Sequence, residues 1–86
     1  MKKLRIWWIP QVPMNAFNWE VNSPLEGKKM LDMLAQYDIF QFENKVKPDY
    51  SNAGGLQEFN EEAEEWWDYE DEECRCIDEI EYEELK

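Results

Sequence analysis

Apolar residues near the N-terminus recur at every second position, which is the period of a β-strand. Leu4, Ile6 and Trp8 share one face of a strand predicted over residues 3–9, and the opposite face also carries apolar side chains. Because both faces are largely apolar, we expect this strand to lie at the centre of a sheet. Prolines then end the strand, and residues 10–22 form an extended connection. A second short alternation within it consists of Phe17, Trp19 and Val21.

The pattern then changes to that of a helix. Ser23, Pro24 and Glu26 form a start signal, in which a serine caps the first turn and a glutamate three residues later returns the hydrogen bond. We therefore predict a helix from about 24 to 37 with one apolar stripe. The stripe is formed by Gly27, Met30, Leu31 and Leu34. A glycine on such a stripe predicts a close approach between helix and sheet.

Three further strands are predicted after the helix, over residues 39–46, 56–59 and 66–70. The first of them places Phe40 and Phe42 on one face. Residues 47–55 are rich in turn formers and predict a loop. Residues 60–65 are acidic and compatible with a loop or a helix, and residues 71–86 form a short terminal helix or fray.

Together these elements predict an α+β fold. One helix packs across a face of a small antiparallel sheet of three to four strands, and an acidic C-terminal segment follows. We expect a single domain over residues 1–86, because a chain of this length builds only one core. Within it, residues 1–60 form a nearly neutral α+β core, and residues 61–86 form an acidic segment that contains aromatic residues.

The charge of the 86-residue chain, −12 in total, is distributed unevenly. Residues 1–50 carry seven basic and six acidic residues, a net charge of +1, whereas residues 51–86 carry two basic and fifteen acidic residues, a net charge of −13. A negative field repels nucleic acid and anionic membranes and attracts basic protein surfaces. No apolar run reaches the ~20 residues of a membrane helix, so we expect an intracellular protein without a membrane anchor.

Two interpretations of the acidic segment remain open. It is a solvated tail, or it is an organised surface that binds a partner. Disordered acidic tails are usually poor in aromatic residues. Here the acids alternate with apolar and aromatic side chains, namely Trp66, Trp67, Tyr69, Ile77, Ile80, Tyr82 and Leu85. These side chains serve as core, as contacts for a partner, or as both.

The spacing of acids on a strand favours a particular kind of partner. Alternate carboxylates on a strand are about 6.7 Å apart, close to the spacing of phosphates along a DNA strand. The segment could therefore occupy a basic groove that normally holds nucleic acid. Its affinity would then come from charge neutralisation and would weaken with salt.

Enzymatic chemistry is disfavoured by the residues that the chain lacks. There is no histidine to act as a general base or metal ligand, so neither Ser23 nor Ser51 has a partner to activate it. Cys74 and Cys76 supply at most half of a zinc site, and a disulfide between them would be strained. Their acidic neighbours should raise the pKa of both thiols. The acidic run 68–73 lacks the glycine of a calcium-binding loop. We therefore expect no enzymatic activity, no metal and no cofactor.

Two stretches of the front half resemble a known group of proteins. They are residues 2–14, KKLRIWWIPQVPM, and residues 47–56, KPDYSNAGGL. They are similar to small acidic proteins of phages and prophages that are mostly uncharacterised or labelled as superinfection exclusion proteins. The acidic segment resembles this group in composition only. The resemblance implies a phage-encoded protein in the host bacterial cytoplasm that acts against host defence or a competing phage.

These observations lead to one main hypothesis. The protein is a phage anti-defence inhibitor of the anti-CRISPR or anti-restriction type, a DNA mimic that binds stoichiometrically to a basic surface of a host nucleic-acid-binding protein. It contacts neither nucleic acid nor membrane directly, and self-association is open. Its predicted contact residues are Glu61, Glu62, Glu64, Glu65, Trp66, Trp67, Asp68, Tyr69, Glu70, Asp71, Glu72 and Glu73.

Two alternatives belong to other classes. An oligomeric sponge could sequester a nucleotide immune signal by stacking its base on tryptophan and holding its phosphate with basic side chains. The residues for this role are Trp7, Trp8, Trp19, Lys2, Lys3, Arg5, Lys28 and Lys29. A superinfection exclusion or virion assembly factor is the other alternative.

Overall fold

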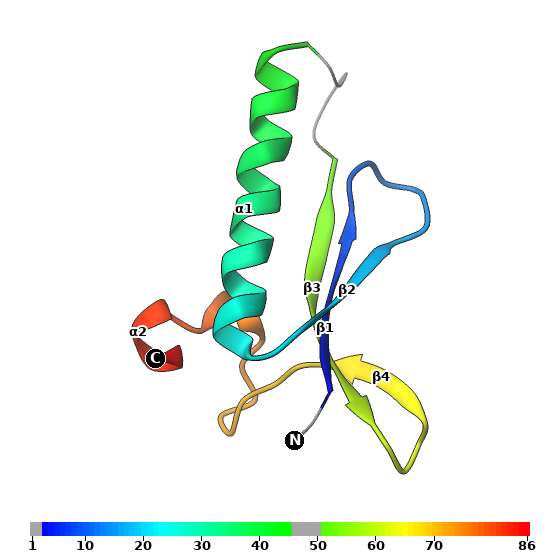
Figure 1. Ribbon diagram of the computed structural model, residues 1–86, viewed down its shortest axis with the longest axis vertical. Helices are drawn as coiled ribbons and strands as arrows, with labels where there is room; N and C mark the ends of the chain where they lie inside the picture. The colour runs from blue at the N-terminus through cyan, green and yellow to red at the C-terminus, as the bar shows by residue number, and fades with distance from the viewer. Residues whose placement is uncertain (1–2, 46–50) are drawn as a thin grey trace.

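The computed structural model describes residues 3–45 and 51–86. Four strands form one antiparallel sheet in the order β2-β1-β3-β4 (Figure 1). They are β1 (Leu4–Ile9), β2 (Phe17–Val21), β3 (Ala53–Asn60) and β4 (Glu65–Asp68). The long helix α1 (Pro24–Glu43) lies across one face of this sheet. The predicted α+β class is therefore confirmed.

The core lies between α1 and the two central strands. Leu4, Ile6 and Trp8 of β1 are buried on the side that faces the helix, and Val21 and Leu56 extend this cluster on β2 and β3. The predicted central position of the first strand is confirmed, because β1 pairs with both β2 and β3.

The predicted serine cap of the helix is confirmed, whereas the Glu26 carboxylate bonds one residue before the N-cap position. The Ser23 side chain accepts a hydrogen bond from the Glu26 amide at 3.1 Å, and the Glu26 carboxylate accepts one from the Asn22 amide at 2.9 Å. Gly27 is buried against the sheet, where a Cβ atom would come within 2.9 Å of the Leu56 side chain. The absence of a side chain thus lets α1 approach the sheet closely.

The predicted end of the helix and the strand predicted after it are wrong. Helix α1 continues to Glu43, so Phe40 and Phe42 are helical and exposed. Two features extend it: Asp38 is buried and accepts a hydrogen bond from the Asn52 side chain, and Asn44 caps the last turn by bonding to the Phe40 carbonyl. Lys45, with a φ of 60°, then ends the helix. The last position of the predicted strand, 46, lies outside the described residues.

Strand β3 is longer than predicted, and it includes Gly54 and Gly55, which we expected in a loop. Each glycine lies opposite a tryptophan of β1, Gly54 opposite Trp8 and Gly55 opposite Trp7. A Cβ atom on Gly55 would lie 2.7 Å from the Trp7 indole nitrogen, and one on Gly54 would overlap the Trp8 ring. Gly54 and Gly55 lie in the strand because the rings of Trp8 and Trp7, on opposite faces of the sheet, occupy the space that larger side chains would need. The loop residues predicted at 47–50 lie outside the described residues.

The C-terminal segment folds back onto α1 instead of fraying. A short 3-10 helix, η1 (Ile77–Glu79), and the short helix α2 (Tyr82–Leu85) follow β4, and residues 61–64 form a turn. Ile77 and Ile80 are buried, and Ile77 belongs to the same core cluster as the sheet residues. Lys28 donates a hydrogen bond to the Ile77 carbonyl, and the Tyr82 hydroxyl donates one to Asp32.

Candidate functional site

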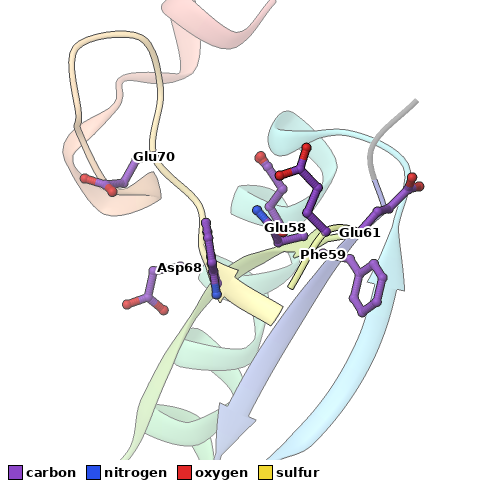
Figure 2. A pocket seen from close by; sticks show the side chains of 8 residues that line it. Glu58, Phe59, Glu61, Asp68 and Glu70 are labelled. Carbon is purple, nitrogen blue, oxygen red and sulfur yellow. The ribbon is translucent and has the colours of Figure 1, made fainter. Parts of the chain in front are cut away.

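Carboxylates gather around a hollow at the β3–β4 hairpin. Its volume is about 730 Å³, and its lining comprises Glu58, Phe59, Asn60, Glu61, Glu62, Trp67, Asp68 and Glu70. Glu58 and Glu61 come from the end of β3 and the turn after it. Asp68 and Glu70 come from the end of β4 and the loop after it, and in Figure 2 their carboxylates point away from Glu58 and Glu61. Residues separated along the chain are thus brought together by the antiparallel pairing.

A second hollow of about 440 Å³ adjoins the first and shares Glu58 and Glu70 with it. The residues around it are Glu58, Tyr69, Glu70, Asp71, Glu72, Glu73, Arg75, Ile80, Glu84 and Leu85. Arg75 is the single basic residue among those that surround the two hollows. We call the combined lining of both hollows the acidic surface.

The hairpin turn is held by its own side chains. The Asn60 carboxamide oxygen accepts a hydrogen bond from the Ala63 amide at 2.7 Å, and Glu64 adopts a positive φ of 54°. The turn therefore has a defined shape that presents Glu61 and Glu62. Next to them, the Trp67 side chain is 52% exposed, so an aromatic ring is available beside the carboxylates.

The loop after β4 is organised around Arg75. Its guanidinium contacts Asp71 at 2.8 Å and Glu84 at 3.0 Å, and the Asp71 carboxylate also accepts hydrogen bonds from the Arg75 and Glu73 amides, both at 2.9 Å. The bond from the Arg75 amide is the largest cause that lowers the pKa of Asp71. Hydrogen bonding to the Arg75 side chain lowers the pKa of Glu84. These two carboxylates are therefore engaged within the chain.

The structure divides the twelve predicted contact residues into groups. Those that line the hollows are Glu61, Glu62, Trp67, Asp68, Tyr69, Glu70, Asp71, Glu72 and Glu73. Glu64 and Glu65 do not line them. Trp66 packs on the sheet face away from α1, where its ring meets Phe59 at 5.3 Å and the Arg5 guanidinium at 4.3 Å. Tyr69 packs against the core cluster, which leaves Trp67 as the exposed aromatic residue of the predicted set.

The expected row of carboxylates along one strand is wrong. Within the predicted contact set, only Glu65 and Asp68 among the acids lie on β4, and they are three positions apart. Strand residues an odd number apart point to opposite faces, so this pair cannot form the row. The acidic residues that line the hollows come instead from a turn, a strand end and a loop.

Seven residues that line the hollows are absent from the predicted contact set. They are Glu58, Phe59, Asn60, Arg75, Ile80, Glu84 and Leu85. The signal for Glu58 was available, because it lies two positions after Leu56 on the same strand and thus on the same face. Its position beside Glu70 depends on the β3–β4 pairing and could not be read from the local pattern.

The two cysteines follow β4, and one of them shows the predicted effect of its acidic neighbours. Cys74 and Cys76 are free and exposed. A hydrogen bond with Glu79 is the main cause that raises the pKa of the Cys76 thiol, and the negative charges of Asp78 and Glu70 add to it. The prediction that acids raise thiol pKa values is confirmed for Cys76.

The residues of the predicted nucleotide sponge do not form one site. Trp8 is buried in the core, and Trp7 lies on the opposite sheet face, while Trp19 is on edge strand β2. Lys28 faces the C-terminal segment, where it lies 5.3 Å from the Tyr82 ring centre. Lys2 lies outside the described residues. Basic and aromatic side chains do meet at Arg5 and Trp66, but there they pack on each other.

Fold and site together define a small α+β protein with a concave acidic surface. A model of the family described as superinfection exclusion gene product 17 matches residues 3–85. A superinfection exclusion protein of Salmonella phage P22 is 48% identical over 87 aligned residues, which cover 88% of this chain and 84% of the phage P22 protein. The chain therefore belongs to this family of phage superinfection exclusion proteins, as the resemblance of its front half predicts.

Two further findings bear on this assignment. No solved structure matches the fold significantly. Among the described residues, no helix has both the length and the apolar composition that crossing a membrane requires.

Proposed function

We propose that this protein acts in superinfection exclusion as a stoichiometric inhibitor, in the cytoplasm of the infected bacterium. Its acidic surface binds a basic groove on a nucleic-acid-binding defence protein of the anti-CRISPR or anti-restriction target type. Binding occupies the groove in place of nucleic acid, and no reaction is catalysed.

The observation that carries this proposal is that acidic residues line two adjoining hollows. Glu58 and Glu70 line both hollows, so the negative charge forms one continuous concave surface and is not scattered over a tail. A concave surface of one sign concentrates its electric field and accelerates the approach of an oppositely charged partner. Lysine and arginine side chains are the groups that would enter such hollows.

The exposed ring of Trp67 also supports the proposal. An exposed tryptophan beside carboxylates can stack on an arginine or lysine, which adds a cation–π contact to the charge interaction. Tryptophan is also frequent among the residues that dominate binding energy at protein interfaces.

The fold supports the proposal because it holds the acidic surface in place. Ile80, which lines the second hollow, is buried, Ile77 belongs to the core cluster, and Arg75 joins Asp71 to Glu84 across the loop. A fixed surface loses less conformational entropy on binding than a disordered tail.

Charge reversal tests the proposal. The variant Glu61→Lys, Glu62→Lys and Glu70→Lys changes the lining of the first hollow, and the matched control reverses Glu43, Asp78 and Glu83, which are exposed and line neither hollow. Both triple variants alter the net charge equally. Exclusion is measured as the plating efficiency of a superinfecting phage on cells that express each protein.

The hollow variant should lose exclusion, and the control should retain it. Affinity purification from the host at low and high salt should recover a basic protein that elutes as salt rises, because added salt reduces the free energy gained from counterion release. Equal exclusion by both variants, with circular dichroism showing folded protein, would overturn the proposal.

A further inference from the structure

A second exposed surface lies on the opposite edge of the sheet from β4. Within residues 3–45 and 51–86, strand β2 pairs only with β1, and no described strand covers its outer edge. Trp19 lies opposite Ile6, and Phe17 lies opposite Trp8, which places both rings on the side of the sheet that carries α1. Yet Phe17 is 53% exposed and Trp19 is 54% exposed, because α1 does not cover this end of β2.

Helix α1 adds its own exposed residues on the same side. Lys28 and Asp32 bond to the C-terminal segment, which follows the edge strand β4, so the opposite flank of the helix lies toward the other edge strand, β2. At 100° per residue, that flank carries Met33, Tyr37 and Phe40, which are all more than half exposed. We call the set Phe17, Trp19, Met33, Tyr37 and Phe40 the aromatic face.

The four aromatic rings of this face form two stacked pairs. Phe17 and Trp19 stack with their centres 6.0 Å apart, and Tyr37 and Phe40 stack at 6.4 Å. Aromatic side chains bury 150–250 Å² each when covered, so these four half-exposed rings offer on the order of 400 Å². That is about half of the ~800 Å² that each partner contributes to a typical stable interface. Strand pairing at the open edge would supply further area.

The distribution of charge over the two sheet edges favours a second copy of this chain as the partner of the aromatic face. The aromatic face contains no charged residue, and it belongs to residues 1–50, whose net charge is +1. At the other edge of the sheet, acidic residues lie in β4 and in the turn before it. Because like charges repel, the β4 strands of two copies cannot readily pair. A second copy of this strongly acidic chain can therefore approach at β2 and is repelled at β4.

We propose that the protein forms a two-fold dimer in which the β2 strands of two copies pair antiparallel and their aromatic faces pack together. With Trp19 on the two-fold axis, Asn18 lies opposite Glu20 of the partner subunit, so the strand's one carboxylate meets an amide and not another acid. The combined sheet has eight strands. Its β4 strands are separated by seven interstrand spacings of about 4.8 Å, roughly 34 Å in all, which is several Debye lengths at physiological salt. The acidic surfaces remain exposed at both ends.

Equilibrium sedimentation of the full chain tests the dimer. The wild type should shift from monomer to dimer as its concentration rises, and added salt should leave the dimer intact. Trp19→Glu places two like charges on the axis and should weaken self-association by about 30-fold, the loss expected for an interface hot spot. Trp67→Glu is the matched control, since Trp67 is equally exposed on the other edge strand, and it should leave self-association unchanged.

A second measurement does not depend on any variant folding. Amide hydrogen exchange of the wild type should slow at residues 17–21 as protein concentration rises, while residues 65–68 exchange at a constant rate. A wild type that stays monomeric at millimolar concentration, an equal effect of both tryptophan variants, or concentration-independent exchange at β2 would overturn the dimer.

Discussion

Trp19 and Trp67 occupy equivalent positions at opposite edges of one sheet. Both lie on edge strands, both point to the side that carries α1, and their exposed fractions, 54% and 52%, are nearly equal. Their surroundings differ. Trp67 stands among Glu61, Glu62 and Glu70, whereas the neighbours of Trp19 are other aromatic rings.

The exposed fraction of an aromatic side chain therefore does not by itself define the partner that it binds. An exposed ring among carboxylates suits a basic partner, because cation and ring attract each other and the acids add charge attraction. An exposed ring in uncharged surroundings suits another apolar surface, including its own copy. One small sheet thereby presents two surfaces with different partners.

The largest expected effect concerns the attachment of the acidic end to the core. Ile77→Ala should lower the free energy of unfolding by about 2–5 kcal/mol, because it opens a cavity in the cluster shared with the sheet. Ile39→Ala, at an exposed helix position, should change it by no more than about 0.5 kcal/mol. Urea denaturation measures both. Similar small losses would mean that the acidic end does not depend on the core.

A smaller effect on stability should follow from removing the cation that balances the acids of the C-terminal segment. Arg75→Ala removes the cation that joins Asp71 and Glu84, so like charges then face each other. The melting temperature should fall at low salt, and the loss should shrink as salt screens the repulsion. Lys29→Ala removes the same charge from an exposed position on α1 and should change the melting temperature little. Equal, salt-independent effects of both variants would contradict this prediction.

The smallest effect is a pH dependence at the contact between α1 and α2. The hydrogen bond to Asp32 raises the pKa of Tyr82 from 10.0 to about 12, so the folded state holds this proton more tightly than the unfolded state. The resulting stability is fully present below pH 10.0 and is lost as the pH rises through about 12. Tyr82→Phe should therefore be less stable than the wild type at neutral pH, and the difference should disappear near pH 12. Urea unfolding at both pH values checks this, and a constant difference would refute it.

The front half was largely predictable because its signals are local. The alternation of β1 and the serine cap at Ser23 each involve neighbours within four residues, and both appear in the structure as the sequence predicts. The acidic site was predictable in part. The acids and Trp67 were found by composition, whereas the internal packing of Trp66 and Tyr69 depends on strand pairing.

The sequence by itself determined the fold class, the buried face of β1 and the start of α1, because periodicity and capping act over a few residues. The tertiary structure decided where α1 ends, since the bond between Asn52 and Asp38 joins segments distant in the chain. It also placed Gly54 and Gly55 in a strand, because their partners are the rings of Trp8 and Trp7. Both binding surfaces depend on strand order and register, which are set by what packs opposite each residue and not by the residues beside it.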